Sequence, residues 1–432
     1  MLTRKIIDKL TQWKNDARHK SLVIKGARQV GKTYAVNEFG AANYERVISL
    51  NFEEHPEYRT IFATDHSADA IYAQLSLFFP GVEFAQRKTL LFLDEIQSCP
   101  DAITSLKFLT IDGRADVIAS GSLLGISYKD VSSYPVGYVD HMEMHSLDFE
   151  EFLWASGISE STVAYVRGFF DRREQVPDAV QQRMMQLFRE YIVVGGMPEA
   201  VQTFVDTKDY SKVIHVQRDI LSEYQNDIAK YATGAEKAKA RACFLSIPKQ
   251  LARDSKRFSY SVVEPRSSAR KYGGSLQWLY DAGIINFCYK LDAPELPFEG
   301  NSDNTKFKVY MRDTGLLVAM LEDGSQKDIL DGNLGIYKGA IYENIVGDIF
   351  AKNGKPLYYY EKNNSLEMDF FIRYDGVATA VEVKSSQNRK AKSMSSLIEN
   401  HGVRRGIKLA PGNYGTIGDR VEVLPIYMTM FL

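Results

Sequence analysis

One stretch, residues 21–33, constrains the fold of this chain more than any other. It reads SLVIKGARQVGKT, in which a short apolar run leads into the pattern GxxxxGKT. A buried strand, this glycine-rich pattern and a following helix together make up a phosphate-binding loop. A turn that matches by chance is disfavoured, because the apolar run stands before the pattern and residues 34–39 continue as a helical stretch. The pattern therefore predicts a nucleotide site in an α/β domain.

The residue types of this loop suit a triphosphate and its metal ion. Gly26 and Gly31 let the backbone curl so that successive N–H groups and the next helix N-terminus point at phosphate oxygens. Lys32 is expected to reach the β and γ phosphates, and the Thr33 hydroxyl to ligate Mg²⁺. We therefore expect ATP and Mg²⁺ as cofactors. The predicted nucleotide-binding residues of the loop are Gly26, Ala27, Arg28, Gln29, Val30, Gly31, Lys32 and Thr33.

Two carboxylates follow the next strongly apolar run. Residues 88–95 read KTLLFLDE, which is typical of a central parallel strand whose carboxyl end opens on the nucleotide site. Asp94 is expected to hold Mg²⁺, and Glu95 to orient and deprotonate the attacking water as a catalytic base. The alternative is a polar strand end. The Asp-Glu pair indicates hydrolysis rather than transfer to an acceptor, so a small-molecule kinase is disfavoured.

A further strand over residues 116–119 ends in Ser-Gly-Ser. Ser120 or Ser122 at this position can hydrogen-bond the γ phosphate or the water, and an ordinary turn explains the same residues equally well.

The whole-chain properties limit the classes of protein to consider. With 432 residues the chain is too long for one core and should form two to four domains. Its net charge of −2 means that any nucleic-acid contact must come from local patches. The three cysteines are scattered, no apolar run is long enough to span a membrane, and the N-terminal stretch reads as an amphipathic helix rather than a signal peptide. We expect a cytoplasmic protein without a membrane partner.

Six segments spread over nearly the whole chain carry a family resemblance: GARQVGKT, LLFLDEIQ, IASGSLLG, SLDFEEFL, GGMPEAV and KVYMRDTGLL. The chain resembles bacterial and archaeal ATPases of the AAA superfamily (AAA_14 type) that carry a C-terminal domain of unassigned role (DUF4143 type). The resemblance implies an ATPase and an α/β fold class: a P-loop domain with a parallel sheet, a winged-helix-like middle and a restriction-endonuclease-like tail. The domains expected are residues 1–150 (ATPase), 151–240 (helical connector), 241–331 (winged-helix-like) and 332–432 (nuclease-like).

The chain departs from the resemblance at one place. Relatives commonly have Gly-Arg where this chain reads YPVGY at residues 134–138, so an arginine that would stabilise the γ phosphate is absent there. Several arginines remain as substitutes, and the sequence does not choose among them: Arg167, Arg172, Arg173, Arg183, Arg189 and Arg218.

The middle of the chain holds a basic segment. After a mainly helical stretch over residues 147–239, residues 241–272 contain eight lysines and arginines, and the order of helices and strand suits a winged helix. The predicted DNA-contacting residues are Arg266, Ser267, Ser268, Arg270 and Lys271. Winged helices also serve as protein adaptors, so a protein partner is the alternative.

The tail contains a nuclease-like set of residues. A helix over residues 337–350 places Glu343 among small and apolar neighbours, and Asp369, Glu382 and Lys384 follow on strand-like runs. The predicted metal ligands are Glu343, Asp369 and Glu382, and the predicted catalytic residues are Asp369, Glu382 and Lys384. This set resembles the D…ExK pattern of restriction-endonuclease-like folds, although Met368 stands where proline is usual.

Two functions are therefore open. In the first, ATP turnover controls a winged-helix and nuclease-like part that acts on nucleic acid. In the second, the protein is an ATP-dependent conformational switch whose tail is catalytically inactive and only binds nucleic acid or a protein partner. A homo-oligomer is open in either case.

Overall fold

The computed structural model describes residues 2–122, 135–231, 235–333, 337–362, 366–385 and 392–432. Within these residues the chain divides into two compact units. The first unit is Thr3–Ser146 with Asp281–Gly283, and the second unit holds nearly all the remaining residues, Leu147–Tyr280 and Ile284–Leu432. No helix in the described ranges combines the length and the apolar character that a membrane crossing needs.

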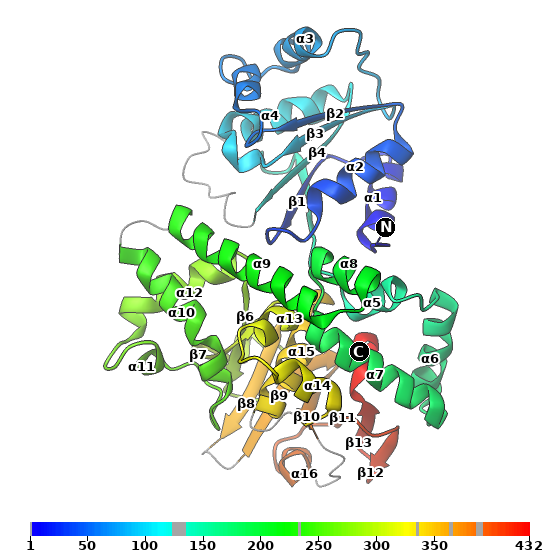
Figure 1. The fold of residues 1–432 in the computed structure, drawn as a ribbon, viewed down its shortest axis with the longest axis vertical. Coiled ribbons are helices and arrows are strands. Elements are labelled where there is room, and N and C mark those ends of the chain that lie inside the picture. Colours follow the sequence, from blue (N-terminus) through cyan, green and yellow to red (C-terminus); the bar gives the residue numbers. More distant parts are fainter. Residues whose placement is uncertain (1, 123–134, 232–234, 334–336, 363–365, 386–391) are drawn as a thin grey trace. The chain divides into compact units, whose positions relative to one another are not determined.

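The first unit is built on a five-stranded sheet in the order β2-β3-β4-β1-β5 (Figure 1). All neighbouring strands in it run parallel, as the buried apolar runs of the sequence predict. Its elements are α1 (Ile6–Asn15), β1 (Ser21–Gly26), α2 (Lys32–Asn43), β2 (Arg46–Asn51), α3 (Ala68–Phe78), β3 (Thr89–Asp94), α4 (Pro100–Asp112), β4 (Asp116–Ser122) and β5 (Val139–Glu143), with short 3₁₀ turns at Pro56–Phe62 and Ile96–Ser98.

Helices cover both faces of this sheet, and the residues of β3 show how. Every residue of β3 is buried. Leu91 and Leu93 belong to a core with α3 and α4, whereas Leu90 and Phe92 belong to a second core with α1 and α2. Because successive side chains of a strand point to opposite faces, one apolar strand serves two cores. The amphipathic N-terminal helix expected from the sequence is α1, which belongs to the second of these cores.

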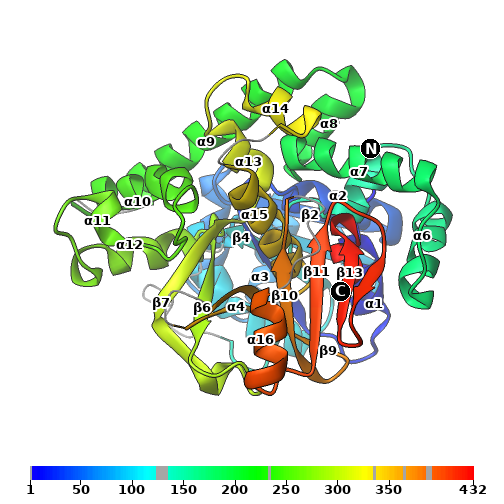
Figure 2. The ribbon, with the colours of Figure 1, turned by 90° about the horizontal axis from the view of Figure 1, so that it is seen from below.

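The second unit combines helices with an eight-stranded mixed sheet, in the order β12-β13-β11-β10-β9-β8-β6-β7 (Figure 2). Its helices are α5 (Phe149–Ala155), α6 (Glu160–Arg172), α7 (Asp178–Val194), α8 (Pro198–Thr207), α9 (Tyr210–Tyr231), α10 (Ala235–Leu251), α11 (Tyr260–Val263), α12 (Ala269–Asp281), α13 (Thr314–Ala319), α14 (Ser325–Asp331), α15 (Lys338–Lys352) and α16 (Lys392–Asn400). Its strands are β6 (Ile285–Leu291), β7 (Ser302–Met311), β8 (Leu357–Lys362), β9 (Leu366–Tyr374), β10 (Val377–Val383), β11 (Arg405–Ala410), β12 (Gly415–Ile417) and β13 (Val421–Pro425). The chain ends in a 3₁₀ turn at Ile426–Phe431.

The sheet joins two segments that the sequence analysis assigned to separate domains. β6 and β7 come from the expected winged-helix-like domain, residues 241–331, yet β6 pairs in parallel with β8 of the expected nuclease-like domain, from Cys288 beside Leu357 to Leu291 beside Tyr360. The expected boundary at residue 331 therefore does not separate two compact units. The reason is that a strand such as β6 must complete its backbone hydrogen bonds, and its second neighbour lies about 70 residues further along the chain.

Candidate functional site

Two glycines shape the phosphate loop, each for a different reason. The loop leaves β1 at Gly26 and enters α2 at Lys32. Gly31 caps α2 with a φ of 91°, in the left-handed region that favours glycine. A side chain at Gly26 would put a Cβ atom 2.3 Å from the Met144 carbonyl oxygen. The sequence analysis assigned both glycines to the phosphates, whereas Gly26 also makes room for a neighbouring backbone segment.

Lys32 lies inside the loop, where only 6% of its surface is exposed. Its ammonium group donates hydrogen bonds to the carbonyl oxygens of Gly26 and Ala27, at 3.1 and 2.8 Å. Burial lowers the pKa of Lys32, while the nearby charges of Glu95 and Asp94 oppose that shift. A buried ammonium group held by carbonyl oxygens can exchange them for the more negative oxygens of a phosphate.

The phosphate loop and the strand β3 meet at Asp94. The Thr33 hydroxyl donates to one carboxylate oxygen of Asp94 at 2.8 Å, and the Ser120 hydroxyl donates to the other. The backbone N–H of Glu95 donates to this second oxygen as well, at 3.1 Å. Ser120 is fully buried, and its hydroxyl is bonded to the Asp94 carboxylate. The side chain of Ser122 lies outside the described part of the structure.

Glu95 is held in a defined position next to Asp94. Its φ of 53° is uncommon for a residue with a side chain, and such backbone conformations cluster at functional sites. The side-chain amide of Gln97 donates to the Glu95 carboxylate. Gly121 in turn makes room for Gln97, because a Cβ there would lie 2.6 Å from the Gln97 amide oxygen. The sequence analysis did not identify Gln97, although it falls within the LLFLDEIQ segment.

The donor set of this site fits a hydrated Mg²⁺ ion. Thr33 and Asp94 supply hydroxyl and carboxylate oxygens, which are the ligand types that Mg²⁺ takes beside phosphate oxygens. The Glu95 carboxylate takes no part in the hydrogen bonds among Thr33, Asp94 and Ser120, and it accepts a hydrogen bond from Gln97 instead.

The arginines considered as substitutes for a phosphate-sensing residue all lie in the second unit. Four of them form ion pairs there: Arg172 with Glu174, Arg173 with Glu422, Arg183 with Glu190, and Arg218 with Asp323. Arg167 lies over the ring of Phe431. Tyr134, the first residue of the departing YPVGY segment, falls outside the described residues.

The predicted DNA-contacting residues surround the start of α12. Arg266, Ser268, Arg270 and Lys271 are exposed, and Ser267 is half-buried. Lys271 forms an ion pair with Glu264, and the Ser267 hydroxyl donates to the Tyr260 carbonyl oxygen. Arg266 and Arg270 are also exposed, and neither of them pairs with a carboxylate among the described residues.

Glu343 occupies the buried face of α15, as predicted, but its partners are cations of the protein itself. The ammonium groups of Lys256 and Lys308 both approach its carboxylate, Lys308 at 3.7 Å, and the Tyr310 hydroxyl donates to it at 3.3 Å. Burial alone would raise the pKa of Glu343, and the two lysines overcome that effect and hold its pKa below the usual value. Lys308 also pairs with Glu367 at 2.7 Å.

A β-bulge places Asp369. Tyr358 pairs with Phe371 and Tyr360 pairs with Met368, so Tyr359 alone faces both Asp369 and Phe370 on β9. Bulges redirect side chains and are frequent beside functional sites. The Asp369 carboxylate accepts a hydrogen bond from the Val383 N–H at 2.8 Å. Burial and the neighbouring charge of Glu343 raise the pKa of Asp369 to about 7.

Glu382 and Lys384 lie near Asp369, and they pair with each other at 2.9 Å. The second carboxylate oxygen of Glu382 is buried and has no hydrogen-bond partner within the described residues. Across the described ranges, however, no three His, Cys, Asp or Glu side chains are arranged to hold a metal ion. In this arrangement Lys256 and Lys308 neutralise Glu343, and the metal-ligand roles of Glu343, Asp369 and Glu382 stay predictions.

Three family profiles match the chain. Residues 18–153 match the AAA domain, residues 185–327 match a domain of unknown function (DUF8612), and residues 338–428 match a second domain of unknown function (DUF4143). The second match spans the expected boundary at residue 240. No curated protein matches the chain.

Solved structures of several ATPases are distantly similar. A Walker-type ATPase of Pyrococcus abyssi is 12% identical, with 74% of this chain and 96% of that chain covered and a TM-score of 0.43. The AMPPCP-bound DnaA of Aquifex aeolicus is 13% identical, with 64% of this chain and 86% of that chain covered and a TM-score of 0.28. The Aeropyrum pernix ORC1 protein in complex with DNA is also 13% identical, with 76% of this chain and 90% of that chain covered and a TM-score of 0.28. Similarity at this level carries no argument about function.

Proposed function

We propose that this protein binds and hydrolyses ATP and that its nucleotide state controls the second unit. The premise is that residues 18–153 form an AAA-type ATPase domain and that residues 338–428 form a DUF4143 domain. The observation that carries the proposal is the chain of hydrogen bonds from Thr33 through Asp94 to Ser120 beside the phosphate loop. It brings together the two motifs that a P-loop ATPase requires.

Each side chain has a task in this mechanism. Lys32 exchanges its carbonyl partners for phosphate oxygens and offsets their charge. Thr33 and Asp94 would hold Mg²⁺, which would neutralise charge on the phosphates. Glu95, oriented by Gln97, accepts a proton from the water that attacks the γ phosphate. Ser120 and the Glu95 N–H keep the Asp94 carboxylate in place.

For the second unit, we propose an action on nucleic acid in which Arg266 and Arg270 contact phosphates near the start of α12. In this proposal the carboxylates and lysine of the D…ExK set act on the bound strand. The support for this proposal is the buried oxygen of Glu382 without a partner in the described residues, together with Asp369, which lies at the bulge and accepts a hydrogen bond from the N–H of Val383, the residue after Glu382.

A second candidate function has an observation of its own. Lys256 and Lys308 neutralise Glu343 in the way a metal ion would, which favours a catalytically inactive tail that engages nucleic acid or a protein partner. In this case the protein is an ATP-dependent conformational switch.

One experiment separates the two candidates. The full chain is incubated with single- and double-stranded DNA or RNA in Mg²⁺ or Mn²⁺, with Lys384→Ala and Glu382→Ala as matched variants. Metal-dependent cleavage that both substitutions abolish establishes the nuclease function. Polynucleotide that stimulates ATP hydrolysis without being cut favours the second candidate, in which Lys256 and Lys308 neutralise Glu343. If polynucleotide is neither cut nor affects hydrolysis, the proposed action on nucleic acid is wrong.

A further inference from the structure

Arg4 lies close to the phosphate loop although it is far from the loop in sequence. It precedes α1 and falls outside the residues that match the AAA domain, which begin at residue 18. Its half-buried guanidinium group donates one hydrogen bond to the Val30 carbonyl oxygen at 3.0 Å and another to the His145 carbonyl oxygen at 2.7 Å. One side chain therefore connects the loop to the segment that follows β5.

The contact with Val30 bears on the direction of a backbone N–H group. In a trans peptide the C=O and N–H bonds point in opposite directions, because the unit is planar. When Arg4 holds the Val30 carbonyl, the N–H of Gly31 in the same peptide unit must point the opposite way. Gly31 directly precedes α2, where the N–H groups of a phosphate loop collect around an anion. Arg4 thus opposes a rotation that would turn a carbonyl oxygen toward the phosphates.

The segment after β5 touches the loop at two further points. The Met144 N–H donates to the Lys25 carbonyl oxygen at 2.8 Å, and the Met144 carbonyl oxygen packs where a Cβ of Gly26 would be. Residues 144 and 145 are therefore connected to both ends of the loop, directly through Met144 and through Arg4.

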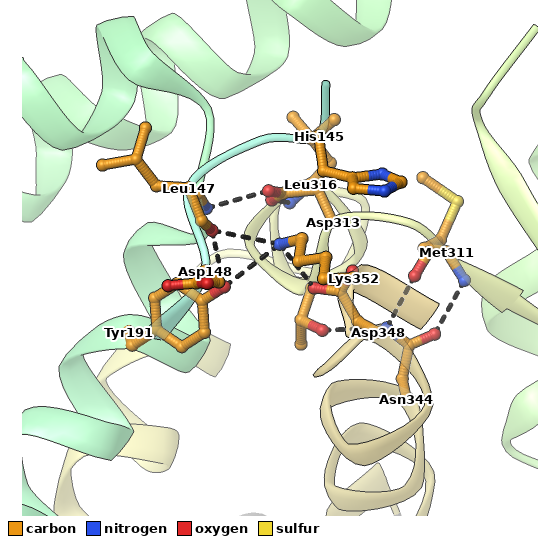
Figure 3. A network of polar contacts seen from close by, with 12 residues as sticks. His145, Leu147, Asp148, Tyr191, Met311, Asp313, Leu316, Asn344, Asp348 and Lys352 are labelled. Atoms are coloured by element: carbon orange, nitrogen blue, oxygen red, sulfur yellow. Dashed lines mark hydrogen bonds and ion pairs between the residues drawn. The ribbon is translucent and has the colours of Figure 1, made fainter. Parts of the chain in front are cut away.

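The second unit begins at Leu147, two residues after His145, and hydrogen bonds hold the Leu147 backbone in place. The Leu147 N–H donates to the Gly196 carbonyl oxygen at 2.7 Å. The Leu147 carbonyl oxygen accepts hydrogen bonds from the Tyr191 hydroxyl at 2.8 Å and from the Lys352 ammonium at 3.1 Å (Figure 3). Lys352 is also paired with Asp348 at 3.0 Å, both on α15.

We propose that Arg4 is a positioning residue for the ATPase reaction: it holds the phosphate loop in its anion-binding shape and ties that shape to the segment leading to Leu147. The inference rests on the proposed ATPase function and adds a residue outside the matched domain. A change of the loop on nucleotide binding would then reach the second unit along the backbone, since only Ser146 separates His145 from Leu147.

The test is a comparison of Arg4→Ala, Arg4→Lys and wild type in the full chain. Arg4→Ala is expected to weaken ATP binding about tenfold, because two hydrogen bonds from a charged donor are lost. Arg4→Lys is expected to recover only part of the loss, since an ammonium group cannot reproduce the fork of a guanidinium group. Binding is measured with a fluorescent ATP analogue, and KM and kcat with a steady-state ATPase assay.

Chemical rescue distinguishes positioning from general stability. Millimolar methylguanidinium is expected to restore ATP affinity to Arg4→Ala and to leave wild type unchanged. Arg18→Ala, at an exposed arginine just after the same helix, is the matched control and should bind ATP like wild type. ATP affinity of Arg4→Ala within twofold of wild type, or a loss that methylguanidinium leaves unchanged, would overturn the inference. Failure of wild type itself to bind ATP would instead overturn the proposed function.

Discussion

Replacing Glu95 with glutamine is expected to slow ATP hydrolysis by about 10²-fold to 10⁴-fold, the usual contribution of a general base. Glutamine keeps the size of the side chain and can still contact Gln97, but it cannot accept a proton from water. ATP affinity should stay close to that of wild type, because Lys32, Thr33 and Asp94 are unchanged. The measurement is phosphate release at saturating ATP, with binding of a fluorescent ATP analogue measured in parallel.

Glu54 provides the matched control for this substitution. It is an exposed glutamate of the same unit, so Glu54→Gln should hydrolyse ATP at the wild-type rate. Hydrolysis by Glu95→Gln within a fewfold of wild type would show that another group activates the water, and the role assigned to Glu95 would have to be abandoned.

Replacing Lys308 with methionine is expected to destabilise the second unit by about 3 kcal/mol, which is the usual cost of removing one partner of a buried ion pair. The Lys308 ammonium is buried, and the charges of Glu343, Glu367 and Asp369 more than offset the effect of burial and raise its pKa, so it is charged at neutral pH. Without it, Glu343 keeps only Lys256 as a cationic partner among the contacts described above. Urea denaturation of the full chain, followed by circular dichroism, measures the loss.

A double-mutant cycle identifies the cause of that loss. Glu343→Gln removes the charge that Lys308 balances, so the combination with Lys308→Met should be clearly less destabilising than the sum of the single substitutions. Lys306→Met, two residues away and paired with Asp303 near the surface, is the control and should cost less than about 1 kcal/mol. Additive losses for Lys308 and Glu343 would mean that the two charges do not stabilise each other.

The sequence could predict those parts of the molecule that depend on neighbours along the chain. The phosphate loop between β1 and α2, the buried strand that ends at Asp94, and the helix that carries Glu343 are all encoded by local patterns of apolar and glycine residues. The mainly helical stretch expected over residues 147–239 contains α5 to α9 and the start of α10. The AAA domain and the DUF4143 domain, which the resemblance implied, are both matched.

The parts that the sequence could not predict depend on contacts between distant segments. Lys256 and Lys308 carry no local signal that they will neutralise Glu343, about 87 and 35 residues further along. The bulge at Asp369 arises from the register between β8 and β9, which no single strand determines. β6 joins the sheet of the tail for a similar reason, since only a long-range partner completes its hydrogen bonds.

The central claim is that the loop from Gly26 to Thr33 binds ATP, and titration of a fluorescent ATP analogue into wild type and Lys32→Ala in the presence of Mg²⁺ tests it most directly. We expect saturable binding to wild type and at least about tenfold weaker binding to Lys32→Ala, because the buried ammonium group no longer offsets the phosphate charge. Equal affinity of the two proteins, or no binding to wild type, would contradict the account.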